Sequence, residues 1–94
     1  MTNHSHKALS FELFTPEVSF ALIDAYMVVM PGSEGEFGVM AGHVSLLATL
    51  SPGMIVIYNN KMQITSRYSI AAGFVEVTEK SVVVFVEHAT EVEA

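Results

Sequence analysis

The sequence predicts an all-β domain, either a sandwich or a barrel. Apolar and polar side chains alternate with a period of two over residues 9–13 and 75–77, which is typical of strands that bury one face. Turn-forming residues separate such segments at intervals of about 8–12 residues, and several short strands at this spacing are typical of sandwiches and barrels.

Three further segments, residues 27–30, 54–58 and 82–86, are apolar throughout and contain many β-branched side chains. They are too short for typical helices, and their composition favours strands. Because both faces of each segment are apolar, we expect these strands to be buried on both sides.

Proline, glycine and asparagine mark the turns between the predicted strands. Pro31–Gly32 has the residues of a type II turn, in which glycine supplies the positive φ. Asn59–Asn60 tolerates the left-handed conformation and predicts a two-residue hairpin. Further turns are predicted at residues 15–16, 51–53 and 78–81, and the last of these closes a hairpin.

The composition indicates one folded domain. The chain has 94 residues, of which 51% are apolar and 15% charged; this length suits a single domain, and the apolar content excludes disorder. Such an excess of apolar residues in a small chain predicts a surface that a partner covers. We expect a flexible N-terminus over residues 1–8, the folded domain over 9–88 and an acidic tail over 89–94.

Charge and cysteine content exclude several classes of function. The net charge is −6, and the four lysines and arginines are scattered, so they cannot form the basic stripe that nucleic acids require. No apolar run approaches the roughly 20 residues of a membrane-spanning helix, and the N-terminus lacks the apolar stretch of a secretory signal. The chain contains no cysteine, which excludes disulfides and thiolate metal sites. We therefore expect neither nucleic-acid binding nor membrane insertion.

Glu34 and Glu36 flank Gly35 in a glycine-rich loop, residues 31–38. General acid–base pairs need pKa values that burial or mutual repulsion pushes apart, whereas carboxylates on a surface loop are solvated. The loop lacks the lysine of a phosphate-binding loop and would repel phosphate. It also lacks the aspartate spacing of a calcium loop.

The residue types of a catalytic triad are present, but the local sequence does not establish their geometry. These residues are Asp24, Ser33, His43 and Ser45. Zinc requires three or four ligands at defined spacing, and the four histidines show no such pattern. The residues alone therefore predict a non-catalytic β-domain without metal, cofactor or small-molecule ligand.

Five motifs follow one another along the chain, at residues 31–39, 42–43, 46–47, 52–53 and 72–77. Together they resemble the epsilon subunits of rotary F-type ATP synthases, with residues 82–86 as the last sandwich strand. The resemblance covers residues 9–87 and implies the family's N-terminal domain, a β-sandwich of about ten strands in two antiparallel sheets.

The resemblance also implies a function and partners. In this family the domain does no chemistry; it sits at the foot of the central stalk, between the gamma subunit and the membrane proteolipid ring. It couples proton translocation to ATP synthesis at the cytoplasmic face of the bacterial inner membrane. Both partners are therefore expected for this chain.

Carried over residue by residue, Ser33, Glu34, Glu36 and Phe37 correspond to the loop that faces the polar loops of the ring. Glu36 is the residue expected to make the polar contact, and His43 corresponds to a loop histidine near the gamma and ring interfaces. Glycines allow close backbone approach, and an exposed carboxylate can accept hydrogen bonds from a partner. We therefore expect these five residues to bind the two partners.

Members of the family commonly continue into a two-helix hairpin that inhibits ATP hydrolysis. We expect this hairpin, and inhibition by that route, to be absent. Two other functions remain open: a free-standing sandwich or barrel that binds a small molecule, and a hydrolase that uses Glu36 and His43.

Overall fold

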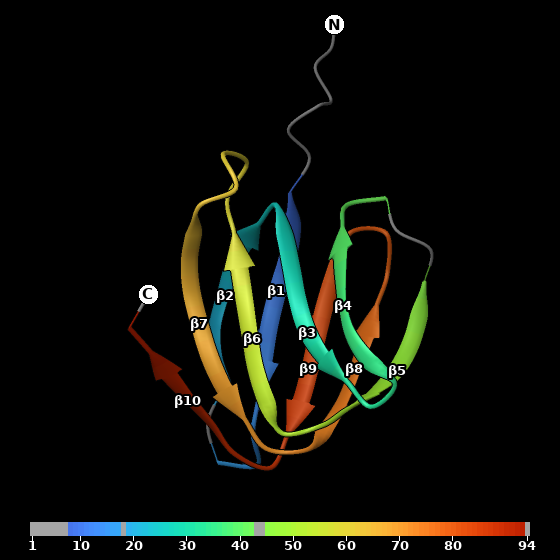
Figure 1. Cartoon of the computed structure of the whole chain (residues 1–94), viewed down its shortest axis with the longest axis vertical. Helices are drawn as coiled ribbons and strands as arrows, with labels where there is room; N and C mark the ends of the chain where they lie inside the picture. The colour runs from blue at the N-terminus through green and yellow to red at the C-terminus, as the bar shows by residue number, and fades with distance from the viewer. Residues whose placement is uncertain (1–7, 18, 43–44, 94) are drawn as a thin grey trace, which may run out of the picture.

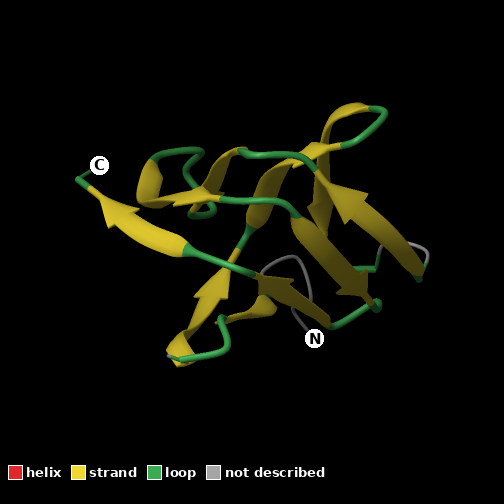
Figure 2. Cartoon of the chain, turned by 90° about the horizontal axis from the view of Figure 1, so that it is seen from below, coloured by secondary structure: helices red, strands yellow, loops and turns green. Residues whose placement is uncertain are grey.

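The computed structural model describes residues 8–17, 19–42 and 45–93, which form strands and loops (Figures 1 and 2). The all-β prediction is therefore confirmed. None of the described residues lies in a helix of the length and apolarity that crossing a bilayer requires. The described residues form ten strands: β1 (Leu9–Phe14), β2 (Ser19–Ala25), β3 (Met27–Gly32), β4 (Gly35–Met40), β5 (Leu46–Leu50), β6 (Gly53–Tyr58), β7 (Ile64–Ile70), β8 (Gly73–Val77), β9 (Ser81–Val86) and β10 (Ala89–Val92).

The strands form two layers that are joined at one corner. The front layer, nearer the viewer in Figure 1, has the order β10-β7-β6-β3-β4, and the back layer has the order β5-β8-β9-β1-β2. β3 pairs with β6 over residues 27–29 and then with β5 at Gly32, which joins the layers. The predicted ten-stranded sandwich is thus confirmed.

One strand pair differs from the antiparallel prediction, because β1 and β9 run parallel. β1 forms a hairpin with β2, and β9 forms another with β8. A short turn forces its two strands to be antiparallel, but no turn links β1 to β9. The direction of this pair is therefore set by how the two hairpins pack side by side.

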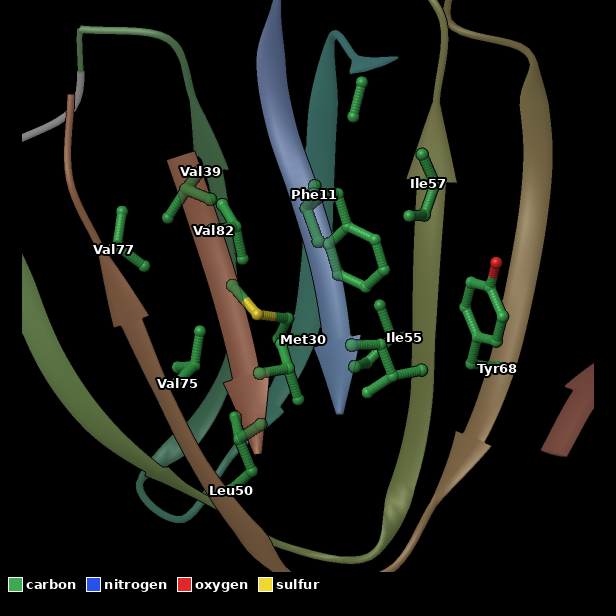
Figure 3. Close-up of a cluster of buried hydrophobic side chains, with 14 of the residues drawn as sticks. Phe11, Met30, Val39, Leu50, Ile55, Ile57, Tyr68, Val75, Val77 and Val82 are labelled. Carbon is green, nitrogen blue, oxygen red and sulfur yellow. The ribbon is translucent and has the colours of Figure 1, made fainter. Parts of the chain in front are cut away.

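Alternate side chains of the strands fill the space between the layers (Figure 3). Leu9, Phe11 and Leu13 of β1 are fully buried, as the alternation predicted. The ring of Tyr68 from β7 stacks on that of Phe11, with 5.9 Å between the centroids. Burial raises the pKa of Tyr68 above its ordinary value, and the carboxylate of Glu91 raises it further, because both disfavour the phenolate.

The three segments predicted to be buried on both sides are buried on only one. In β3 the alternate residues Val28 and Met30 are buried, whereas Val29 between them is partly exposed. In β9, Phe85 is 38% exposed between buried neighbours. The prediction was wrong because a two-layer sandwich has a single interior, so the other apolar side chains lie on the outer faces.

The turn between β3 and β4 lies two residues later than predicted. Pro31 and Gly32 belong to β3, and Gly32 pairs with Gly35 across the turn. Ser33 and Glu34 are therefore the turn residues, and Gly35 takes the positive φ of 129°. The prediction of a type II turn at Pro31–Gly32 was wrong because the pairing of β3 with β4 includes both residues and ends only at the Gly32–Gly35 pair.

The loop between β6 and β7 spans residues 59–63, rather than the predicted two-residue hairpin. The carboxamide oxygen of Asn59 accepts hydrogen bonds from the backbone N–H groups of Lys61 and Gln63, at 2.9 and 3.0 Å. An asparagine side chain that mimics a backbone turn in this way stabilises a longer loop. Met62 in this loop takes a positive φ of 60°.

The C-terminal part of the chain contains one predicted turn and one strand that was not predicted. At the turn between β8 and β9, the N–H of Thr78 donates to the carbonyl of Ser81 at 2.9 Å, as expected for residues 78–81. Residues 89–94 were expected as an acidic tail beyond a domain boundary at residue 88. Instead β10 pairs with β7 and widens the front layer.

Candidate functional site

The turn between β3 and β4 is exposed and is held against β5. Ser33 and Glu34 are exposed at its tip. The backbone N–H of Ser33 donates to the carbonyl of Thr49 at 3.0 Å, and the two side-chain hydroxyls lie 2.8 Å apart. On the other side, the N–H of Ser51 donates to the carbonyl of Pro31 at 2.8 Å. These bonds give the turn a defined position at one end of the sandwich.

The structure separates the five residues that the sequence predicted as a binding site. Ser33, Glu34 and Glu36 are exposed, whereas Phe37 is partly buried and packs against the core. His43 lies outside the described residues. The exposed part of the predicted site therefore consists of Ser33 and Glu34 in the turn and Glu36 on β4, and Phe37 packs on the inner side of β4.

A groove of about 410 Å³ lies between this turn and β5. Ser33, Glu34 and Phe37 line one side, and Leu47 and Thr49 of β5 line the other. Leu47 is 71% exposed, although large apolar side chains at the surface usually mark interaction sites only where they cluster. Leu47 in the groove therefore indicates an interaction site only if other exposed apolar side chains lie close to it.

Three stacked aromatic rings lie next to the groove on the outer face of the back layer. Phe74 of β8, Phe85 of β9 and Phe14 of β1 occupy neighbouring positions in the strand register. The centroids of Phe74 and Phe85 are 5.2 Å apart, and those of Phe85 and Phe14 are 5.4 Å apart. Phe74 is 45% exposed and Phe85 38%. We call these three residues the aromatic row.

The aromatic row and the turn form one continuous surface. Thr49 pairs with Phe74 in the register and bonds to Ser33 at the turn, so it links the two. A hollow of about 440 Å³ borders the row, and Phe14, Phe74 and Phe85 all contribute to its wall. We call the turn, Leu47, Thr49 and the aromatic row together the docking surface.

Carboxylates surround the apolar part of the docking surface. Glu76 pairs with Leu47 across β5 and β8, Glu12 lies on β1 beside Val83 of β9, and Glu87 lines the hollow. An apolar centre with a charged rim is the usual anatomy of a protein–protein interface. Among the described residues, no group of three histidine, aspartate or glutamate side chains could hold a metal ion.

Sequence analysis missed the aromatic row. One indication was available, because Phe74 and Phe85 occupy the outward positions of strands whose inward positions are valines. Alternation alone can show that such a residue points outward. It cannot show that rings from three different strands stack on one another.

A comparison of the whole chain with known protein families identifies the family to which the chain belongs. Residues 8–92 match the family model described as the ATP synthase delta/epsilon chain, β-sandwich domain. The chain belongs to the ATP synthase delta/epsilon family. The predicted resemblance is thereby confirmed, and it extends over β10 as well.

Curated relatives of this delta/epsilon-family chain are named ATP synthase epsilon chain. The one from Rhodospirillum centenum is 39% identical over 87 residues, which cover 92% of this chain and 60% of the relative. The one from Campylobacter fetus is 42% identical over 81 residues, which cover 86% of this chain and 62% of the relative. The chain thus spans about 60% of the length of these two relatives.

Two solved ATP synthase structures contain a chain with the same fold as this delta/epsilon-family chain. The match in the Euglena gracilis mitochondrial enzyme has a TM-score of 0.81 at 22% identity and covers 96% of this chain and 56% of that chain. The match in the central stalk and c-ring of the Tetrahymena thermophila mitochondrial enzyme has a TM-score of 0.71 at 16% identity. It covers 95% of this chain and 69% of that chain. At sequence identities this low, the structural similarity shows that the chains share a fold and nothing more.

Proposed function

We propose that this chain is a non-catalytic rotor subunit of an F-type ATP synthase, which links the gamma subunit to the proteolipid ring. It would couple proton translocation to ATP synthesis at the cytoplasmic face of a bacterial inner membrane. The observation that carries the proposal is the docking surface, where an acidic turn and an aromatic row are joined through Thr49. Membership of the delta/epsilon family supports it.

The two parts of the docking surface suit two different partners. Glu34 in the turn and Glu36 beside it on β4 are exposed carboxylates, which suit the polar loops of the ring because they accept hydrogen bonds from amide and cationic donors. The aromatic row suits the gamma subunit, because clustered aromatic side chains carry much of the binding energy at protein interfaces. His43, which the resemblance places near both interfaces, remains a prediction.

The alternative of a small-molecule-binding sandwich needs an internal cavity for its ligand. The space between the layers is occupied instead by side chains such as Phe11, Met30 and Ile55, all 0% exposed (Figure 3). Protein interiors of this kind are closely packed and leave no room for a ligand. The outer docking surface therefore supports a protein partner better than a small molecule.

Adding this chain to a bacterial ATP synthase depleted of its epsilon subunit is expected to restore ATP-driven proton pumping in vesicles. The variant Phe85→Asp should fail at the same concentration, because a charge placed at the centre of an apolar contact weakens binding to gamma by about 30-fold or more. The matched control Thr90→Asp adds the same charge at an exposed position of β10 and should restore pumping. Equal restoration by both variants would contradict the proposal.

A disulfide should form between the turn and the ring in the assembled complex. We expect Glu36→Cys, paired with a cysteine in the polar loop of a ring subunit, to give a cross-linked band under mild oxidation. The control Gln63→Cys lies on the β6–β7 loop, at the end of the sandwich opposite the turn (Figure 1), and should give none. If Gln63→Cys cross-links and Glu36→Cys does not, the orientation proposed here is wrong.

A further inference from the structure

The hollow of about 440 Å³ that borders the aromatic row lies where β1 and β9 end and β8 begins. The aromatic row forms one part of its wall. The other part includes three exposed residues just outside these strands, Pro16, Ala72 and Glu87. Pro16 and Ala72 are short and apolar, so the charge in this lining is the carboxylate of Glu87. The hollow therefore combines an aromatic and apolar wall with one anionic group.

The carboxylate of Glu87 is not neutralised by the described part of the chain. Lys61 lies on the β6–β7 loop, Arg67 on β7 in the front layer, and Lys80 in the turn at the far ends of β8 and β9; none of these three lines the hollow. Within residues 8–17, 19–42 and 45–93, no side chain donates a hydrogen bond to Glu87 or forms an ion pair with it. Because the net charge of the chain is −6, its field also favours a cationic group at this position.

The lining of the hollow suits a long side chain with a cationic end. The methylene stem of a lysine or arginine packs against apolar surface while its charged end reaches a polar group. Arginine fits this lining better than lysine, because its planar guanidinium stacks on aromatic side chains and is less strongly hydrated than an ammonium group. A guanidinium also donates two parallel hydrogen bonds to one carboxylate.

The hollow is continuous with the docking surface. Phe14, Phe74 and Phe85 belong to both, so a partner seated on the aromatic row also covers the hollow. Exclusion of water strengthens an ion pair formed there, whereas a carboxylate that is buried without a counter-charge is costly. A partner that covers the row must therefore bring a cation to Glu87.

We propose that the hollow receives an arginine side chain of the gamma subunit. The stem of this arginine packs along the aromatic row, and its guanidinium donates two hydrogen bonds to the carboxylate of Glu87. The pair determines where gamma sits along the docking surface, because apolar contacts alone are not directional. The inference rests on the proposed function, since the arginine comes from the subunit that the aromatic row is proposed to bind.

Arginine footprinting in the reconstituted complex tests the contact. A bacterial ATP synthase depleted of its epsilon subunit is saturated with this chain and treated with phenylglyoxal, which modifies accessible arginine side chains. Mass spectrometry then identifies the modified positions in gamma. We expect the unchanged chain to protect one gamma arginine. Glu87→Gln, which removes the charge and keeps the shape, should abolish this protection. The matched control Glu79→Gln, exposed in the turn between β8 and β9, should retain it.

The affinity of the fluorescently labelled chain for the depleted complex tests the charge. Glu87→Gln should weaken binding by about ten-fold or more, as expected for the loss of a charge-assisted hydrogen-bonded pair, whereas Glu79→Gln should bind like the unchanged chain. The affinity of the unchanged chain should also fall more steeply with added salt than that of Glu87→Gln, because salt screens the attraction between charges. A loss of packing alone would leave the salt dependence as it is.

The outcomes separate this inference from the proposed function. If the unchanged chain binds the complex and protects no gamma arginine, or protects a gamma lysine from acetylation instead, the inference is overturned and the proposed function stands. Equal protection of the arginine by Glu87→Gln and by the unchanged chain has the same meaning. If the unchanged chain does not bind the depleted complex, both are overturned.

Discussion

Replacing Gly73 with alanine is expected to destabilise the sandwich by about 3 kcal/mol, at the upper end of overpacking effects. Gly73 begins β8 and pairs with Leu50 of β5 on one side and Val86 of β9 on the other. A Cβ at this position would meet the carbonyl oxygen of Phe85, and would lie 2.8 Å from the Cα of Val86. These are backbone atoms, which cannot rotate away, so the pairing of β8 with β9 would have to shift.

Urea unfolding followed by circular dichroism measures this effect. The matched control is Gly38→Ala, because a Cβ on Gly38 would find its nearest neighbour, Cγ2 of Val29, at an ordinary 3.5 Å. Alanine there should change the free energy of unfolding by less than about 1 kcal/mol in either direction. Similar losses for both variants would show that the close approach at Gly73 does not limit the fold.

Phe11→Ala is expected to lower the free energy of unfolding by about 3–5 kcal/mol, the usual range for removing a buried aromatic ring. The ring is 0% exposed and connects the layers by stacking on Tyr68 at 5.9 Å between centroids. Domains of this size are stable by only about 5–15 kcal/mol, so the variant should lose a large fraction of its stability, measured as a lower midpoint of urea unfolding.

Phe14 on the same strand provides the control for Phe11. It points to the outer face, where it stacks on Phe85 with 5.4 Å between centroids. Phe14→Ala should cost about 1 kcal/mol, because little of the core is opened, yet it should weaken docking to gamma. A loss of stability as large as that of Phe11→Ala would mean that the aromatic row serves the fold rather than a partner.

The strands and their inward faces could be predicted because alternation is a property of neighbouring residues. Leu9, Phe11 and Leu13 show this, since any strand through them places all three on one side. The turns were predicted less well. Pro31 and Gly32 suit a type II turn, but both residues pair with β4 and the turn follows them. At Asn59 a side-chain hydrogen bond, rather than the backbone, determines the length of the loop.

The candidate site was predicted only in part, because a sequence motif does not show which of its side chains are exposed in the folded chain. Glu34 and Glu36 came from a motif that is continuous in the sequence, and the structure does expose them. Phe37 belongs to the same motif but faces the core. The partly exposed outer face of β3 and β6 could not be anticipated, because residues 27–30 and 54–58 were expected to be buried on both sides.

Composition predicted that some apolar surface would remain for a partner, since half of the side chains in this 94-residue chain are apolar and 15% are charged. Sequence patterns established the class of fold, the inward residues of the alternating strands and the acidic loop. They could not say where the remaining apolar surface lies. Phe14, Phe74 and Phe85 are far apart in the chain, and they meet only because β1, β8 and β9 pair in one register. Pairing between strands depends on the packing of the whole domain, and so the docking surface is a property of the folded chain.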